Sequence, residues 1–116
     1  MNYNNFLKMK DRKDKSLGFD VSSADINPAL YPFQNHLVRW ALKRGRAALF
    51  EDCGLGKTPQ QLDWARIVAA ESSKPVIIFA PLAVAEQTAR EGTKFSIPVQ
   101  LCRTQSDVQP GVNITN

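Results

Sequence analysis

Apolar residues at helical spacing begin directly after Pro32. Gly45 suits the position that follows a last helical turn, and proline suits a first turn. Four residues recur at i, i+4, i+7 and i+8, the spacing of one helical face: Phe33, Leu37, Trp40 and Ala41. The pattern predicts an amphipathic helix over residues 32 to 44 and places Trp40 in the core rather than on a base-stacking surface.

Two short apolar runs predict strands. Residues 47 to 50 (Ala-Ala-Leu-Phe) are too few for a helix and precede a glycine-bearing segment, which indicates a buried strand. Residues 76 to 80 (Val-Ile-Ile-Phe-Ala) carry the strongest strand signal, and because no polar residue alternates there we expect both faces to be covered. Between the runs, residues 57 to 70 predict a helix that accepts Pro59 in its first turn and packs Trp64 in the core.

The remaining pattern continues this alternation. A third helix is expected over residues 82 to 94, after Pro81, and further strands over residues 99 to 102 and 112 to 115. Apolar strands separated by helices are typical of right-handed βαβ units in a parallel sheet. The sequence therefore predicts an α/β fold in which helices flank a parallel sheet.

Composition narrows the class of protein. A chain of 116 residues that is 43% hydrophobic fits one soluble domain. No apolar run is long enough to cross a bilayer and no signal peptide precedes the domain, so we expect a cytoplasmic protein without a membrane partner. Two distant cysteines and one histidine provide no zinc site.

The net charge of +4 permits a polyanionic partner without requiring one.

Residues 1 to 30 form an expected leader. A short helix is predicted near residues 4 to 13, followed by an irregular connector. Five basic residues lie in the leader, and we interpret them as a solvated segment rather than a nucleic-acid contact: Lys8, Lys10, Arg12, Lys13 and Lys15. Residues 31 to 116 then form the domain.

The segment Glu-Asp-Cys-Gly-Leu-Gly-Lys-Thr, residues 51 to 58, carries the chemistry. It lies between a predicted strand and a predicted helix, where backbone N–H groups and the helix dipole converge on an anion. Lys57 supplies a charge to the β- and γ-phosphates, and the Thr58 hydroxyl is suited to Mg²⁺. The predicted nucleotide-binding residues of this loop are Cys53, Gly54, Leu55, Gly56, Lys57 and Thr58. A glycine-rich helix start without ligand is the alternative.

Glu51 replaces the first glycine of the general phosphate-loop pattern. With this acidic residue, the segment resembles motif I of superfamily 2 helicases, in particular the Swi/Snf-like branch. Tyr-Pro-Phe-Gln, residues 31 to 34, is similar to the family segment whose glutamine reads adenine. The resemblance thus implies ATP and Mg²⁺ as cofactors, with Gln34 at the adenine; a surface glutamine is the alternative.

Two later segments resemble nucleic-acid-contacting motifs of the same family. Residues 77 to 82 with Gln87 look like motif Ia, and residues 112 to 116 look like the start of motif Ib. The resemblance spans about residues 25 to 116, is closest to phage and prophage helicases, and implies a RecA-like P-loop NTPase lobe in a bacterial host cell. It implies contacts to nucleic acid, with DNA expected, from Pro81, Leu82, Gln87 and Thr115.

Hydrolysis in this family needs an acidic Walker B pair and arginines from a second lobe. The sequence has neither, since no acid after Thr58 ends an apolar strand. We therefore expect a partial RecA-like lobe, truncated before the Walker B strand, that binds nucleotide without turnover. It is either the N-terminal part of a helicase-like ATPase or a complete, non-catalytic nucleotide-binding or motor-interacting module. We expect the isolated chain to expose a sheet edge and to self-associate.

Overall fold

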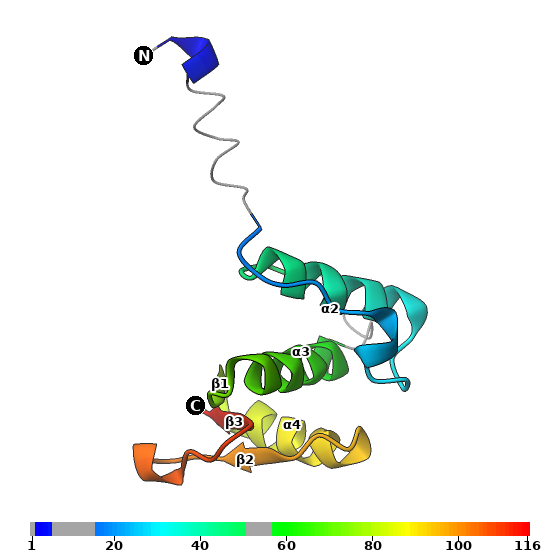
Figure 1. The fold of residues 1–116 in the computed structure, drawn as a ribbon. Helices are drawn as coiled ribbons and strands as arrows, with labels where there is room; N and C mark the ends of the chain where they lie inside the picture. Colours follow the sequence, from blue (N-terminus) through cyan, green and yellow to red (C-terminus); the bar gives the residue numbers. More distant parts are fainter. Residues whose placement is uncertain (1, 6–15, 51–56) are drawn as a thin grey trace.

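The computed structural model describes residues 2–5, 16–50 and 57–116. Helix α2 (Pro32–Arg44) lies on helix α3 (Lys57–Ser72), and α3 lies on a layer formed by helix α4 (Leu82–Lys94) and three strands (Figure 1). The strands are β1 (Val76–Phe79), β2 (Val99–Leu101) and β3 (Val112–Thr115), with short 3-10 turns η1 (Ser23–Asp25) and η2 (Gln105–Asp107). The α/β class is confirmed.

The sheet is parallel and has the strand order β1-β3-β2. Val112 of β3 aligns with Val76 of β1 on one side and with Val99 of β2 on the other. Helix α4 connects β1 to β2, whereas the connection from β2 to β3 contains only η2. The predicted parallel sheet, the bounds of α4 and the bounds of β3 are confirmed.

Helices α3 and α4 pack on the same face of the sheet. Their apolar residues form one core with the inward residues of the strands, and its buried members are Leu62, Ala65, Ile78, Ala85, Ile97, Val112 and Ile114. Leu62, Ala65 and Ile114 are fully buried. Trp64 packs against this core, as predicted.

The opposite face of the sheet is open. Ile77 is 45% exposed and Phe79 is 76% exposed, although the apolar run predicted that both faces of this strand would be covered. That prediction is wrong because, within the part of the chain that the structure describes, both sheet-packing helices lie on one side. The loop around η2 approaches the other side, where residues of the loop and of the strands line a pocket.

Helix α2 buries a different face from the predicted one. Its buried residues are Gln34, Val38, Ala41 and Leu42, while Trp40 is 41% exposed and Phe33 is 45% exposed. The placement of Trp40 in the core is therefore wrong; the Arg44 guanidinium lies over its ring at 5.9 Å from the centroid. The difference arises because residues 19 to 30 pack beside α3 against Val38 and Leu42, and contribute Ile26 and Leu30 to a second core.

Residues 17 to 19 close the end of α2. The backbone N–H groups of Leu17, Gly18 and Phe19 donate to the carbonyls of Arg44, Lys43 and Leu42. A Cβ at Gly18 would collide with the Leu42 carbonyl, so only glycine permits this approach. Gly45 follows the last helical residue, as predicted, and its φ of +82° lies in the region that favours glycine.

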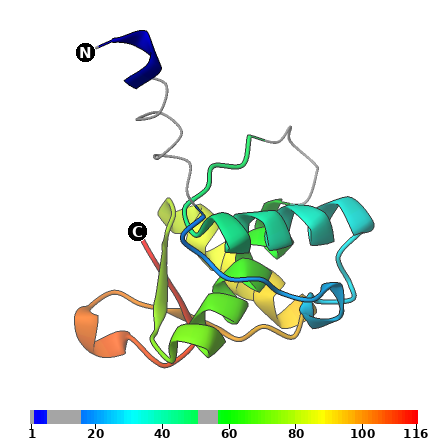
Figure 2. The same ribbon diagram turned by 45° about the horizontal axis from the view of Figure 1, so that its top comes forward.

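Residues 47 to 50 do not form the predicted strand. They pair with no strand of the sheet, and Phe50 is 97% exposed. Figure 2 shows this segment leaving the end of α2 and running apart from the sheet. An apolar run forms a strand only when it pairs with a neighbour, and this segment pairs with neither of the outer strands β1 and β2.

The predicted helix over residues 4 to 13 falls largely outside the described residues; residues 3 to 5 are helical. No helix in the described ranges is both long enough and apolar enough to cross a membrane.

Candidate functional site

Helix α3 begins at the predicted phosphate-binding residues. Lys57 is its first residue and is exposed, and Thr58 follows at intermediate exposure. Pro59 occupies the first turn, as predicted. The other predicted loop residues, Cys53, Gly54, Leu55 and Gly56, lie outside the described residues.

Packing on two sides holds α3 in place. Leu62 and Ala65 face the sheet core, and Ile67 faces the core shared with α2. The 16-residue helix therefore directs the N–H groups of its first turn, and the positive end of its dipole, toward one fixed region. An anion is the ligand that such a helix start attracts.

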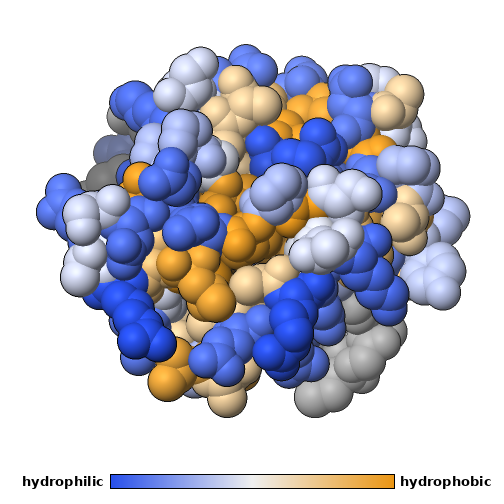
Figure 3. All heavy atoms as spheres, turned by 90° about the horizontal axis from the view of Figure 1, so that it is seen from below, coloured by the Kyte–Doolittle hydropathy of each residue, from blue (hydrophilic) through white to orange (hydrophobic). Residues whose placement is uncertain are grey.

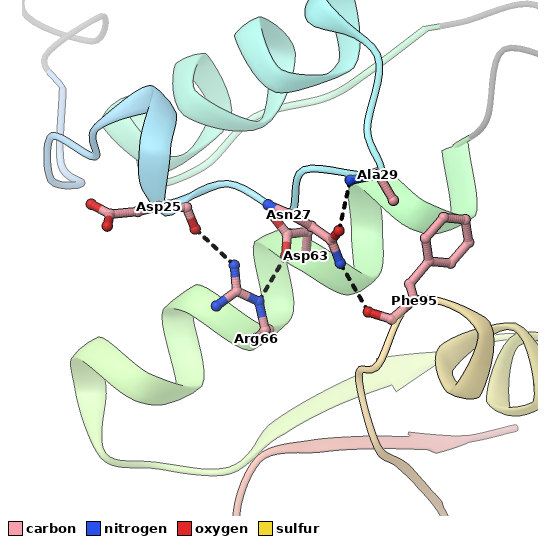
Figure 4. A network of polar contacts seen from close by, with 6 residues as sticks. All are labelled: Asp25, Asn27, Ala29, Asp63, Arg66 and Phe95. Carbon is pink, nitrogen blue, oxygen red and sulfur yellow. Dashed lines mark hydrogen bonds and ion pairs between the residues drawn. The ribbon is translucent and has the colours of Figure 1, made fainter.

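A buried polar network ties α3 to the N-terminal segment (Figure 4). Asp63 is fully buried, and its carboxylate accepts hydrogen bonds from Arg66 Nε at 2.7 Å and from the Asn27 backbone N–H at 3.0 Å. Arg66 Nη2 donates to the Asp25 carbonyl at 2.9 Å, and Asn27 Nδ2 donates to the Phe95 carbonyl at 2.9 Å. Sequence reasoning missed this network; the available signal was an acid between core positions of α3 with an arginine three residues later.

A cavity of about 370 Å³ lies between α2 and α3, and we call it the α2–α3 cavity. Most of its lining is apolar, with two amides and one ammonium group among the rest: Val38, Ala41, Ala47, Leu49, Lys57, Gln60, Gln61 and Trp64. Lys57 therefore belongs both to the phosphate-binding helix start and to this cavity.

Gln34, the predicted adenine contact, lies near the beginning of α2. It is only 4% exposed, and its Oε1 accepts a hydrogen bond from the Tyr31 backbone N–H at 2.8 Å. This is the arrangement of a residue that caps a helix at its third position. The rings of Tyr31 and Phe33 stack beside it, with centroids 6.4 Å apart. The role of Gln34 in adenine binding stays a prediction.

Two of the predicted nucleic-acid contacts meet at one end of the sheet. Leu82 and Thr115 line a cavity of about 290 Å³ together with Glu86 and Arg103. Pro81 precedes α4 as its N-cap residue, and Gln87 is exposed on the same helix. The cavity lies at the carboxyl ends of β2 and β3, the edge at which parallel sheets usually bind ligands.

Two titratable groups near this edge are perturbed. The backbone N–H groups of Arg103 and Thr104 donate to the Asp107 carboxylate at 2.9 Å and 3.0 Å, and they lower the pKa of Asp107. Burial, together with the Asp107 charge, raises the pKa of the Cys102 thiol. Cys102 is therefore a poor nucleophile at neutral pH.

The basic side chains of α2 are partly engaged by the N-terminal segment. Arg39 Nε donates to the Val21 carbonyl at 3.0 Å, and Lys43 Nζ lies 3.9 Å from the Asp20 carboxylate. These contacts join α2 to the N-terminal segment through two of its basic residues, Arg39 and Lys43.

No group of three or more metal-ligating side chains occurs in the ranges that the structure describes. A single Thr58 hydroxyl in the first turn of α3 suits Mg²⁺ when nucleotide phosphates and water supply the other oxygens.

Comparisons with protein-family models, with curated proteins and with solved structures find no match to this chain.

Proposed function

We propose that this protein binds Mg²⁺-ATP at the start of α3. The observation that carries the proposal is the sequence Gly-Leu-Gly-Lys-Thr, residues 54 to 58, which runs directly into a helix beginning at Lys57. A glycine-rich turn followed by a helix in a parallel α/β protein is the setting in which such residues cradle phosphate.

Each residue of the site then has a distinct role. The loop N–H groups and the positive end of the α3 dipole bind the phosphates, and the Lys57 ammonium neutralises the β- and γ-phosphates. Mg²⁺ supplies charge that shields the triphosphate, and the Thr58 hydroxyl donates one of its oxygen ligands. The packing of α3 between two cores keeps this helix start in position.

We further propose that the chain is a RecA-like, ATP-binding part of a helicase-like, nucleic-acid-dependent ATPase. The order of the helicase-like segments supports this reading, as does the meeting of Leu82 and Thr115 at the carboxyl edge of the sheet. Nucleic acid, DNA in the resembled family, would contact Pro81, Leu82, Gln87 and Thr115. No acid after Thr58 ends an apolar strand of the sequence, so the chain alone binds nucleotide without hydrolysing it.

Calorimetric titration with Mg²⁺-ATP tests the proposal. Lys57→Ala should weaken binding by about 1.5 to 3 kcal/mol, the usual contribution of a hydrogen bond to a charged group. Lys74→Ala is the matched control, because Lys74 is an exposed lysine beyond the other end of α3. Equal affinity in Lys57→Ala and Lys74→Ala would rule out the phosphate site.

A further inference from the structure

The α2–α3 cavity has the size and chemistry of a small-molecule site. Its volume of about 370 Å³ falls in the range of ligand pockets, roughly 300 to 1,000 Å³. Its walls are mainly apolar, and the Gln60 and Gln61 amides and the Lys57 ammonium group are its polar components. Such a lining favours a planar apolar body that carries a few hydrogen-bonding groups and an anionic end.

We propose that the α2–α3 cavity holds the base of the nucleotide whose phosphates bind at Lys57. The inference rests on the proposed function and adds a position for the base. Lys57 lines the cavity and also begins α3, so one ligand can reach both places. The half-buried Trp64 ring offers a face for stacking, and the exposed Gln61 amide can pair with the edge of a base.

This position differs from the contact that the helicase resemblance implies. Gln34 is the third residue of α2 and does not line the cavity, and its Oε1 already accepts the Tyr31 N–H. The cavity instead borders the middle of α2, through Val38 and Ala41, and the first two turns of α3.

Two neighbouring alanines provide a matched pair of variants. Ala47 and Ala48 are both exposed, but only Ala47 lines the cavity. Ala47→Phe places a ring at the cavity without replacing a core residue. Ala48→Phe adds the same ring at the next residue, which does not line the cavity. Binding of Mg²⁺-ATP and of Mg²⁺-tripolyphosphate, which has no base, is measured for both variants and for the unmodified protein.

The proposal expects Ala47→Phe to weaken ATP binding about tenfold or more, as for a displaced stacked base, and to leave tripolyphosphate binding unchanged. Ala48→Phe should change neither affinity. Equal ATP affinities in the two variants, or an equal loss of ATP and tripolyphosphate in Ala47→Phe, would overturn the cavity as the base site. After either of these outcomes, the proposed function would still stand if Lys57→Ala weakens ATP binding. Failure of the unmodified protein to bind either ligand would instead overturn the proposed function, and the base site with it.

Discussion

At the level of single residues, Asp63 is expected to contribute strongly to stability. Its fully buried carboxylate accepts hydrogen bonds from Arg66 and from the Asn27 backbone, and thereby joins α3 to the N-terminal segment. The Arg66 side chain is 39% exposed, so solvent screens its share of the interaction.

Asp63→Ala should lower the free energy of unfolding by about 2 to 3 kcal/mol, because charged hydrogen bonds are lost and the Asn27 N–H loses its acceptor. Urea denaturation measures the change. Glu71→Ala, an exposed acid on the same helix, should stay within about 0.5 kcal/mol of the unmodified protein. Matching midpoints for the two variants would show that the network contributes nothing to stability.

The sequence predicted features set by neighbouring residues better than contacts between distant segments. The start of α3 at Lys57 followed from a glycine-rich segment and a local helical pattern, both of which are visible along the chain. The network of Asp63 was not predictable in the same way, because its partners come from Asn27 and Arg66, and the contact with Asn27 exists only in the folded chain. The capping contact of Gln34 with Tyr31 is also local. The sequence did not predict it, because the same residues resemble a helicase motif and were interpreted as an adenine contact.

At the scale of elements, the long connection from β2 to β3 is fixed by one side chain. Asn113 is fully buried in β3; its Oδ1 accepts from the Gln109 N–H at 2.9 Å, and its Nδ2 donates to the Gln109 carbonyl at 2.8 Å. Nδ2 also donates to the Val76 carbonyl of β1 at 3.3 Å. The Asn113 amide therefore holds the end of this non-helical connection against β3 and β1.

Asn113→Ala should destabilise the protein by about 2 to 3 kcal/mol, because it leaves buried backbone groups of the connection without partners. Amide hydrogen exchange should accelerate at Gln109 in particular. Gln100→Ala is the control, since Gln100 aligns with Asn113 on β2 but is exposed. Unchanged exchange at Gln109 in Asn113→Ala would contradict this role.

Helix and strand positions were more predictable than the faces they bury. The bounds of α4 and the β-branched run of β1 are local signals, and both were confirmed apart from one residue at the end of β1. Residues 47 to 50 carry the same local signal, but a strand also needs a hydrogen-bonded partner, and this segment pairs with neither of the outer strands β1 and β2. The buried face of α2 depended on residues 19 to 30, which show no periodicity.

At the scale of the whole molecule, the uncovered side of the sheet is the main departure from a closed α/β layer. Hydrophobic side chains gather within a hydrophilic surround on the side where β2 lies in Figure 1 (Figure 3). The exposed large hydrophobic residues of β1, β2 and α4 are Ile77, Phe79, Leu82, Val84 and Leu101. Exposed apolar side chains of this kind promote association.

The double variant Ile77→Thr and Phe79→Thr should therefore reduce self-association without lowering stability, because both side chains already contact water. Sedimentation velocity over a range of concentrations measures the effect. Val84→Thr, on the exposed side of α4, is the control and should have a smaller effect. A chain that is monomeric at every concentration before substitution would contradict the prediction.

Binding of Mg²⁺-ATP at the start of α3 can be followed residue by residue. The most direct test is a ¹H–¹⁵N NMR titration, which suits a protein of 12.9 kDa. The largest shift changes with Mg²⁺-ATP should fall on the amides of residues 54 to 58, and Lys57→Ala should move these changes to Mg²⁺-ATP concentrations at least about tenfold higher. No shift change at these amides at millimolar Mg²⁺-ATP, or changes confined to other elements, would contradict it.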